Sequence, residues 1–241
     1  MSYLRLRRSQ IIIGTFALFS LLAVLLPSVD LHISRLFFDG DAFPRAPWWH
    51  RLQQDGLNYF LCTSMLAATA MWLWNRIVKD NVGGMDGRKV LYLLLVLIVG
   101  AGLIVNVAFK DNFGRARPRD VVEFNGPRTF TPAFVMTDQC RKNCSFSSGD
   151  VAAGFFSIAL VMLSRRRVYY LAAGALGTAI ALSRLASGAH FLSDVFTSFF
   201  VMLIVSDALH HYMILSRQGE AQPLPGAMPA LDRVSTGDAR S

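Results

Sequence analysis

Long apolar stretches divide this chain into segments that are each close to the length of a membrane-spanning helix. About 20 apolar residues cross the hydrocarbon core of a bilayer. Six stretches approach that length, and they cover residues 10–27, 57–75, 90–109, 151–164, 168–185 and 191–215. The helix of the fourth, shortest stretch is expected to begin near Ser147. The pattern therefore predicts an all-α, polytopic membrane protein with six transmembrane helices in one bundle over residues 1–217.

The composition agrees with a chain that lies in lipid. Hydrophobic residues make up 53% of the sequence, charged residues only 17%, and the mean hydropathy is +0.39. Soluble domains of this length carry more charge and fewer long apolar stretches. The net charge is +8, but the basic residues fall between apolar stretches, where they set membrane orientation. We therefore expect the bilayer, and not nucleic acid, as the partner of these charges.

The basic clusters predict the orientation of the six helices. They precede the first stretch and lie between the second and third and between the fourth and fifth, so all three fall on one side. Their members are Arg5, Arg7 and Arg8, then Arg76, Lys79, Arg88 and Lys89, then Arg165, Arg166 and Arg167. The positive-inside rule makes this side cytoplasmic, with both termini, in a bacterial inner membrane. The first stretch is expected to remain as an uncleaved anchor, and residues 218–241 are expected to form a disordered cytoplasmic tail.

The two long connections on the opposite, periplasmic side differ in character. Residues 28–56 are amphipathic and contain Trp48 and Trp49, so we expect them along the membrane surface. Residues 110–147 contain many basic residues on the side where the charge rule disfavours them. These are Lys110, Arg115, Arg117, Arg119, Arg128, Arg141 and Lys142. They form either a solvated basic face that meets anionic lipid or a pocket for an anion.

Residue types at the outer helix ends favour the anion pocket. Lys110 ends the third helix and Arg184 ends the fifth, which places them at one membrane depth, where ionisable residues are candidates for function. His190 and Asp194 are four residues apart and share a helix face. Asp194 can accept the hydrogen of one imidazole nitrogen, and the other nitrogen is then a nucleophile for phosphorus. A metal ion is not expected, because the Lys and Arg cluster would repel it.

Three short blocks carry a resemblance to a known family. Lys110 to Arg117-Pro118 has the form K-x6-RP, Ser147 to Asp150 reads SSGD, and Ser183 to Asp194 has the form SR-x5-H-x3-D. This arrangement resembles the type 2 phosphatidic acid phosphatase superfamily of membrane lipid phosphatases, whose blocks are K-x6-RP, PSGH and SR-x5-H-x3-D. The first and third blocks match completely, and the second matches at Ser148 and Gly149.

The resemblance implies both an activity and a set of site residues. His190 would form a phosphohistidine with support from Asp194, without a metal or another cofactor, on a phosphorylated membrane lipid. The phosphate would be bound by Lys110, Arg117, Ser148, Gly149 and Arg184. The basic residues suit phosphate oxygens, and a helix N-terminus at Ser148 and Gly149 suits an anion. The phosphohistidine could pass its group to water or to a second acceptor, so hydrolysis and phosphotransfer both remain open.

Asp150 departs from the family pattern, which has a histidine there as the expected general acid. An ordinary Asp is ionised at neutral pH, so three roles are open for Asp150. It could donate a proton only when phosphate is bound, it could align the water that hydrolyses the phosphohistidine, or the protein could bind lipid phosphates without turnover. The favoured substrate is lipid A, through the resemblance to bacterial lipid A phosphatases and the basic outer loop. Undecaprenyl pyrophosphate and phosphatidylglycerophosphate are the alternatives.

Two cysteines lie four residues apart in the long basic connection. Cys140 and Cys144 would meet an oxidising periplasm, and helical spacing would bring their Cα atoms to a distance that fits a disulfide bond. The alternative is two free thiols. A disulfide here would restrain a loop next to the predicted site.

Overall fold

The computed structural model describes residues 2–44, 47–164, 166 and 168–216. Within these ranges the chain is helical and contains no β-strand, apart from an isolated bridge between Val121 and Arg128. The predicted tail, residues 218–241, lies outside the described residues, as do Arg165, Arg167 and the side chains of Arg5, Trp48 and Trp49. The predicted all-α fold is confirmed for the part that is described.

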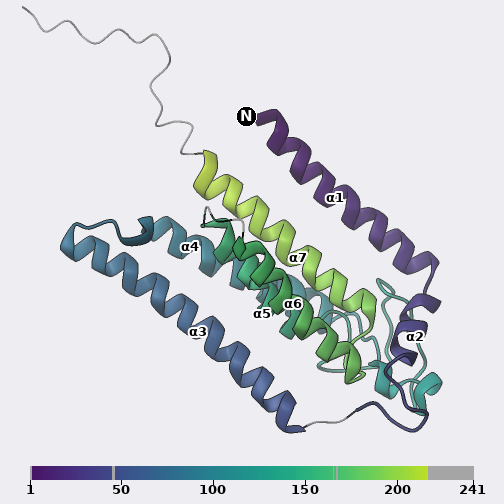
Figure 1. The fold of residues 1–241 in the computed structure, drawn as a ribbon. Helices are drawn as coiled ribbons and strands as arrows, with labels where there is room; N and C mark the ends of the chain where they lie inside the picture. The colour runs from purple at the N-terminus through teal and green to yellow at the C-terminus, as the bar shows by residue number, and fades with distance from the viewer. Residues whose placement is uncertain (1, 45–46, 165, 167, 217–241) are drawn as a thin grey trace, which may run out of the picture.

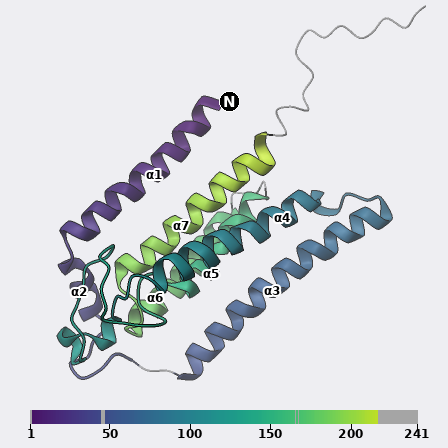
Figure 2. The ribbon, with the colours of Figure 1, turned by 180° about the vertical axis from the view of Figure 1, so that it is seen from behind.

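The helices run roughly side by side in one bundle (Figures 1 and 2). The long elements are α1 (Ser2–Leu25), α3 (Pro47–Val78), α4 (Gly87–Leu95), the π-helix η2 (Val96–Lys110), α5 (Gly149–Met162), α6 (Val168–Ala186) and α7 (Leu192–His210). The short elements are α2 (Ser28–Arg35), η1 (Val82–Gly84), η3 (Pro118–Asp120), η4 (Val122–Phe124) and η5 (His211–Leu215). η2 continues α4, and η5 continues α7.

Four helices of the described chain are long and apolar enough to cross a membrane. They are Arg7–Leu25, Gly87–Lys110, Val168–Ala186 and Leu192–Leu215, and they correspond to four of the six predicted spans. The other two predicted spans each miss one of these two criteria. α3 has 32 residues but is not apolar enough, and α5 is strongly apolar but has only 14 residues.

α5 lies at the centre of the bundle. Nearly all of its residues are buried, and it packs against α6, α7 and η2. The 18-residue window of α1, in contrast, has no residue buried inside the protein, and α1 contacts mainly α7. In both views α1 and α3 lie on opposite sides of the other helices (Figures 1 and 2). The shortest apolar helix is therefore the one that the protein itself, and not lipid, surrounds.

Small residues allow α5 and α6 to pack closely. A Cβ atom at Gly177 on α6 would lie 2.2 Å from the ring of Phe155, and one at Gly154 on α5 would lie 2.5 Å from Ile180 Cδ1. Small residues allow membrane helices to approach each other this closely. Gly174, one turn away on α6, has no atom within 4 Å of its virtual Cβ position.

α2 and the loop between η2 and α5 cover one end of the bundle (Figure 1). The amphipathic stretch predicted to lie along the membrane surface also packs on protein, because α2 buries Asp30 and Ser34 and contacts the start of α7. A small aromatic core joins α2, the loop and α7. Its buried members are Phe43, Ala116, Val121, Phe124 and Phe191, with Leu31, Phe37, Phe38 and Phe130 around them.

The packing of α5 on α6 predicts different outcomes for two glycines of the same helix. Gly177→Ala should lower the free energy of unfolding by about 1–3 kcal/mol, because the added methyl group displaces the Phe155 ring. Gly174→Ala, the matched control, should leave stability unchanged or slightly raised, since alanine favours a helix. The measurement is the midpoint of thermal unfolding in detergent. Equal midpoints for the two variants would contradict this packing.

Candidate active site

The three predicted blocks meet at the end of the bundle that the long loop covers. Lys110 ends η2, Arg117 follows in the loop, and Ser148, Gly149 and Asp150 begin α5. Arg184 lies in the last turn of α6, His190 lies between α6 and α7, and Asp194 lies in the first turn of α7. Segments that are far apart in the sequence therefore contribute to one site, as the spacing of the blocks predicts.

His190 is held by a backbone carbonyl group. Its side chain is buried, and Nδ1 lies 2.7 Å from the carbonyl oxygen of Ser145. Because a carbonyl oxygen can only accept, Nδ1 carries the hydrogen and donates it. Nε2 then keeps its lone pair and is the nucleophilic atom of the ring. The hydrogen bond thus fixes the tautomer that attack on phosphorus requires.

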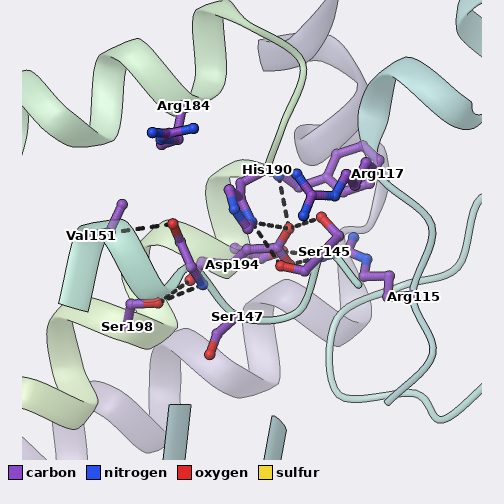
Figure 3. A network of polar contacts seen from close by, with 12 residues as sticks. Arg115, Arg117, Ser145, Ser147, Val151, Arg184, His190, Asp194 and Ser198 are labelled. Atoms are coloured by element: carbon purple, nitrogen blue, oxygen red, sulfur yellow. Dashed lines mark hydrogen bonds and ion pairs between the residues drawn. The ribbon is translucent and has the colours of Figure 1, made fainter. Parts of the chain in front are cut away.

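Asp194 supports His190 through Ser145, which differs from the direct contact that the sequence predicts. The nearest carboxylate oxygen of Asp194 is 3.9 Å from Nδ1 of His190, which is too long for a hydrogen bond. The same oxygen accepts from the hydroxyl group of Ser145 and from the backbone N–H of Phe191, at 2.8 Å. The carbonyl of Ser145 therefore takes the place expected for Asp194, and Asp194 fixes Ser145 (Figure 3).

Burial and positive charge keep the imidazole neutral. Burial lowers the pKa of His190 well below its usual value, and the positive charges of Arg117, Lys110 and Arg184 lower it further. The hydrogen bond to Ser145 acts in the opposite direction but does not reverse the shift. The ring is therefore uncharged at neutral pH, which is the form in which Nε2 can attack an electrophile.

Three cations surround this imidazole. In the view of Figure 3, His190 lies between Arg184 and Arg117. Arg117 donates from Nε and Nη2 to the carbonyl oxygen of Asn143, at 3.3 and 2.8 Å. Nη2 of Arg184, which is buried, pairs with the Asp150 carboxylate at 2.9 Å. Guanidinium and ammonium groups in such an arrangement can bind the oxygens of one phosphate group.

The N-terminus of α5 forms another part of the site. Ser148 is the N-cap residue: its hydroxyl group accepts from the N–H of Val151 at 3.4 Å, and its own N–H donates to Ser198 Oγ on α7 at 2.8 Å. Gly149 allows a close approach, because a Cβ there would lie 2.8 Å from Asn106 Oδ1. First-turn N–H groups have no partner within the helix, so this terminus can bind an anion.

Sequence reasoning missed two buried residues, Asp30 and Arg115. The sequence places Arg115 either on a solvated basic face or in an anion pocket, but it is 1% exposed and pairs with Asp30 at 2.8 Å and with Asp194 at 2.6 Å. Asp30 lies on α2, well before the three blocks. The available signal was weak: a single acidic residue directly after an apolar span.

The structure joins Cys140 and Cys144 in a disulfide bond, with their Cα atoms 5.6 Å apart. Asn143, which accepts from Arg117, lies inside the ring that this bond closes. Ser145, which accepts from His190, follows the ring directly. The disulfide therefore restrains the two backbone carbonyl groups that hold Arg117 and His190.

Metal ligands do not gather at this site or elsewhere in the described residues: no three His, Cys, Asp or Glu side chains form a group that could hold a metal ion. The arrangement offers instead a neutral imidazole, three cations and a helix N-terminus. Together these groups can bind a phosphate and transfer its phosphorus to nitrogen.

This chain is similar to known proteins both in sequence and in fold. The lipid A 4'-phosphatase of Francisella tularensis subsp. novicida is 42% identical over 122 residues, which span 48% of this chain and 55% of that protein. The lipid A 4'-phosphatase of Rhizobium etli is 31% identical over 229 residues, 85% of this chain and 89% of that protein. The fold is similar to a crystal structure of a transmembrane PAP2 type phosphatidylglycerolphosphate phosphatase from Bacillus subtilis. The TM-score is 0.56 at 19% identity, over 88% of this chain and 98% of that one.

The family assignment follows from the matched region. Residues 89–217 match the PAP2 superfamily, and they contain η2, the long loop and α5 to α7, from which all three blocks come. The PAP2 superfamily is that of the type 2 phosphatidic acid phosphatases, which the three blocks resemble. This chain belongs to the PAP2 superfamily.

Proposed function

We propose that this protein is an integral membrane phosphatase that removes a phosphate group from lipid A. The observation that carries the proposal is the buried, neutral imidazole of His190, oriented by the Ser145 carbonyl group among Lys110, Arg117 and Arg184. A relative named lipid A 4'-phosphatase, which is 31% identical over 85% of this chain, supports the choice of lipid. The loop that covers the site carries the basic residues that a large anionic headgroup needs.

The chemistry follows from the positions of these groups. Nε2 of His190 attacks phosphorus, the bond from phosphorus to the lipid oxygen breaks, and a phosphohistidine forms. Lys110, Arg117, Arg184 and the first turn of α5 at Ser148 and Gly149 stabilise the phosphoryl oxygens. Water then attacks phosphorus, releases inorganic phosphate and restores His190. The three cations supply the positive charge that a metal ion would otherwise bring, so we propose a metal-independent reaction.

Asp150 is proposed as the proton donor to the lipid alcohol. In the structure its carboxylate is ion-paired with Arg184 at 2.9 Å, and its side chain is 30% exposed. An incoming phosphate competes for Arg184 and places a dianion next to the carboxylate, and nearby negative charge favours protonation. Asp150 would thus gain its proton when the substrate binds.

The proposed orientation places the site in the periplasm of a bacterial inner membrane. The N-terminal end of α1 and the C-terminal end of α7 lie at the end of the bundle opposite the site (Figure 1). There Arg8 and Ser9 bind Asp207 of α7, at 3.3 and 2.8 Å. The positive-inside rule assigns this basic end to the cytoplasm. In this proposal α3 and α5 complete six spans within residues 1–217.

The direct test is phosphate release by the purified protein in the presence of a metal chelator. Lipid A, undecaprenyl pyrophosphate and phosphatidylglycerophosphate are the substrates, and mass spectrometry identifies the products. We expect lipid A to lose phosphate, and His190→Ala to lower the rate by about 10⁴-fold or more, because the nucleophile is removed. His211→Ala, at the exposed opposite end, is the control. Binding of lipid A without release of phosphate would show a non-catalytic binder and contradict the proposal.

The role of Asp150 predicts a dependence on the leaving group. Asp150→Asn should slow hydrolysis of the lipid phosphate by about 10²–10⁴-fold, because an alcohol leaves poorly without a proton. The same variant should retain most of its activity on p-nitrophenyl phosphate, whose leaving group needs no proton. Asp55→Asn on the exposed side of α3 is the matched control. Equal losses on both substrates would instead assign Asp150 to the attacking water, and no loss on either would remove it from the reaction.

The disulfide predicts a redox-dependent activity. Replacing Cys140 and Cys144 together by serine should lower kcat/KM by about 10-fold or more, because the carbonyl groups of Asn143 and Ser145 lose their restraint. Reduction of the wild-type protein should have the same effect and add the mass of two hydrogen atoms. Cys62→Ser is the control. Full activity of the double variant would show that the loop holds these groups without the bond.

A further inference from the structure

We propose that Asp30, Arg115 and Ser145 are positioning residues that hold His190 and offset the positive charge it acquires on phosphorylation. The contacts form a buried polar chain from Asp30 through Arg115, Asp194 and Ser145 to His190. This inference rests on the proposed phosphatase activity. It makes α2, which precedes the region matched to the superfamily, part of the active site.

The buried polar chain begins at Asp30 on α2. Its side chain is buried and accepts from the backbone N–H of Ser193 at 2.9 Å, from the Ser193 hydroxyl group and from Arg115 Nη2 at 2.8 Å. Asp30 thereby ties the first turn of α7 to the loop. These three donors take the place of water around the buried carboxylate.

Arg115 is the second member and is held on every side. Nη1 donates to Asp194 at 2.6 Å and to Ser193 Oγ at 2.8 Å, and Nε donates to the carbonyl oxygen of Thr131 at 2.8 Å. The guanidinium carbon lies 4.3 Å from the centre of the Phe191 ring, in a cation–π contact. Its place is therefore fixed by the fold, and it in turn fixes the carboxylate of Asp194.

Ser145 is the last member before the imidazole. Its hydroxyl group donates to Asp194, its backbone N–H donates to the carbonyl oxygen of Arg115 at 2.9 Å, and its own carbonyl accepts from His190. Movement of Asp194 or Arg115 would therefore move the acceptor that orients the ring. A hydrogen bond that strengthens as its donor becomes positive also stabilises the phosphorylated ring.

The charges of the buried polar chain explain why Asp30 is needed in addition to Asp194. Two carboxylates and one guanidinium group leave one net negative charge beside the ring. When Nε2 bonds to phosphorus and Nδ1 keeps its hydrogen, the ring becomes positively charged. Without Asp30, Arg115 would neutralise Asp194, and the buried groups behind Nδ1 would carry no net negative charge to offset the positive ring. None of these groups is among the proposed phosphate-binding residues, so we expect them to act through His190.

The decisive variant is Asp30→Asn, which keeps the shape and removes the charge. We expect kcat to fall about 10- to 100-fold, the range for supporting residues in other sites, with KM nearly unchanged. The loss should be the same on lipid A and on p-nitrophenyl phosphate, because the ring becomes positive with either leaving group. Affinity for vanadate, which mimics the transition state, should fall, while affinity for inorganic phosphate should not.

Two further variants make the test complete. Asp41→Asn, in the exposed segment after α2, is the matched control and should behave as wild type. Ser145→Ala keeps the carbonyl group and loses the link to Asp194, so it should show a loss of the same kind. If Asp30→Asn does not reach the wild-type melting temperature, the result for Ser145→Ala decides whether the inference holds.

The results separate this inference from the proposed function. Unchanged kcat and vanadate affinity in a folded Asp30→Asn would overturn the inference, as would a parallel loss of phosphate affinity, which indicates general damage to the site. Where Asp30→Asn does not fold, wild-type kcat and vanadate affinity in Ser145→Ala would overturn it. A wild-type protein that hydrolyses none of the substrates would overturn the proposed function itself.

Discussion

The hydrogen bond from His190 Nδ1 to the carbonyl oxygen of Ser145 is the interaction on which the site depends. It fixes which nitrogen carries the hydrogen, and it leaves the lone pair of the ring on Nε2. The acceptor is a backbone atom, so its position is only as firm as the loop that carries it. The disulfide bond, the aromatic core below the loop and the contacts of Asp194 all restrain that segment.

The proposed site has two opposing electrostatic demands, one for binding phosphate and one for the charge of the His190 ring. In the proposed reaction, phosphate binding needs Lys110, Arg117 and Arg184 close together, and their charges lower the pKa of His190 before attack. After attack on phosphorus the same charges disfavour the positive ring. Asp194 alone cannot offset the positive charge of the ring, because Arg115 pairs with Asp194. In our proposal the negative charge of Asp30 offsets the charge of Arg115 and so meets the second demand, while the three cations remain available to phosphate.

The sequence predicted the parts of this arrangement that residue type and spacing determine. Apolar length indicated six helices, and each coincides with a helix of the structure, four of them long and apolar enough to cross a membrane. The three blocks indicated that Lys110, Arg117, Arg184 and His190 would meet. The short α5 shows the limit of length as a signal, because a helix surrounded by protein need not match the bilayer. The Ser145 carbonyl could not be predicted, since every residue has one. The pairing of Asp30 with Arg115 joins residues 85 apart and arises only from tertiary packing.

The central claim is that Nε2 of His190 accepts the phosphoryl group. The most direct measurement is rapid quenching of the purified protein during turnover of lipid A, followed by digestion and mass spectrometry under alkaline conditions that preserve phosphohistidine. We expect an acid-labile phosphate on His190 that forms and decays at rates compatible with turnover. Release of phosphate with no phosphorylated protein, or with phosphate on another residue, would contradict it.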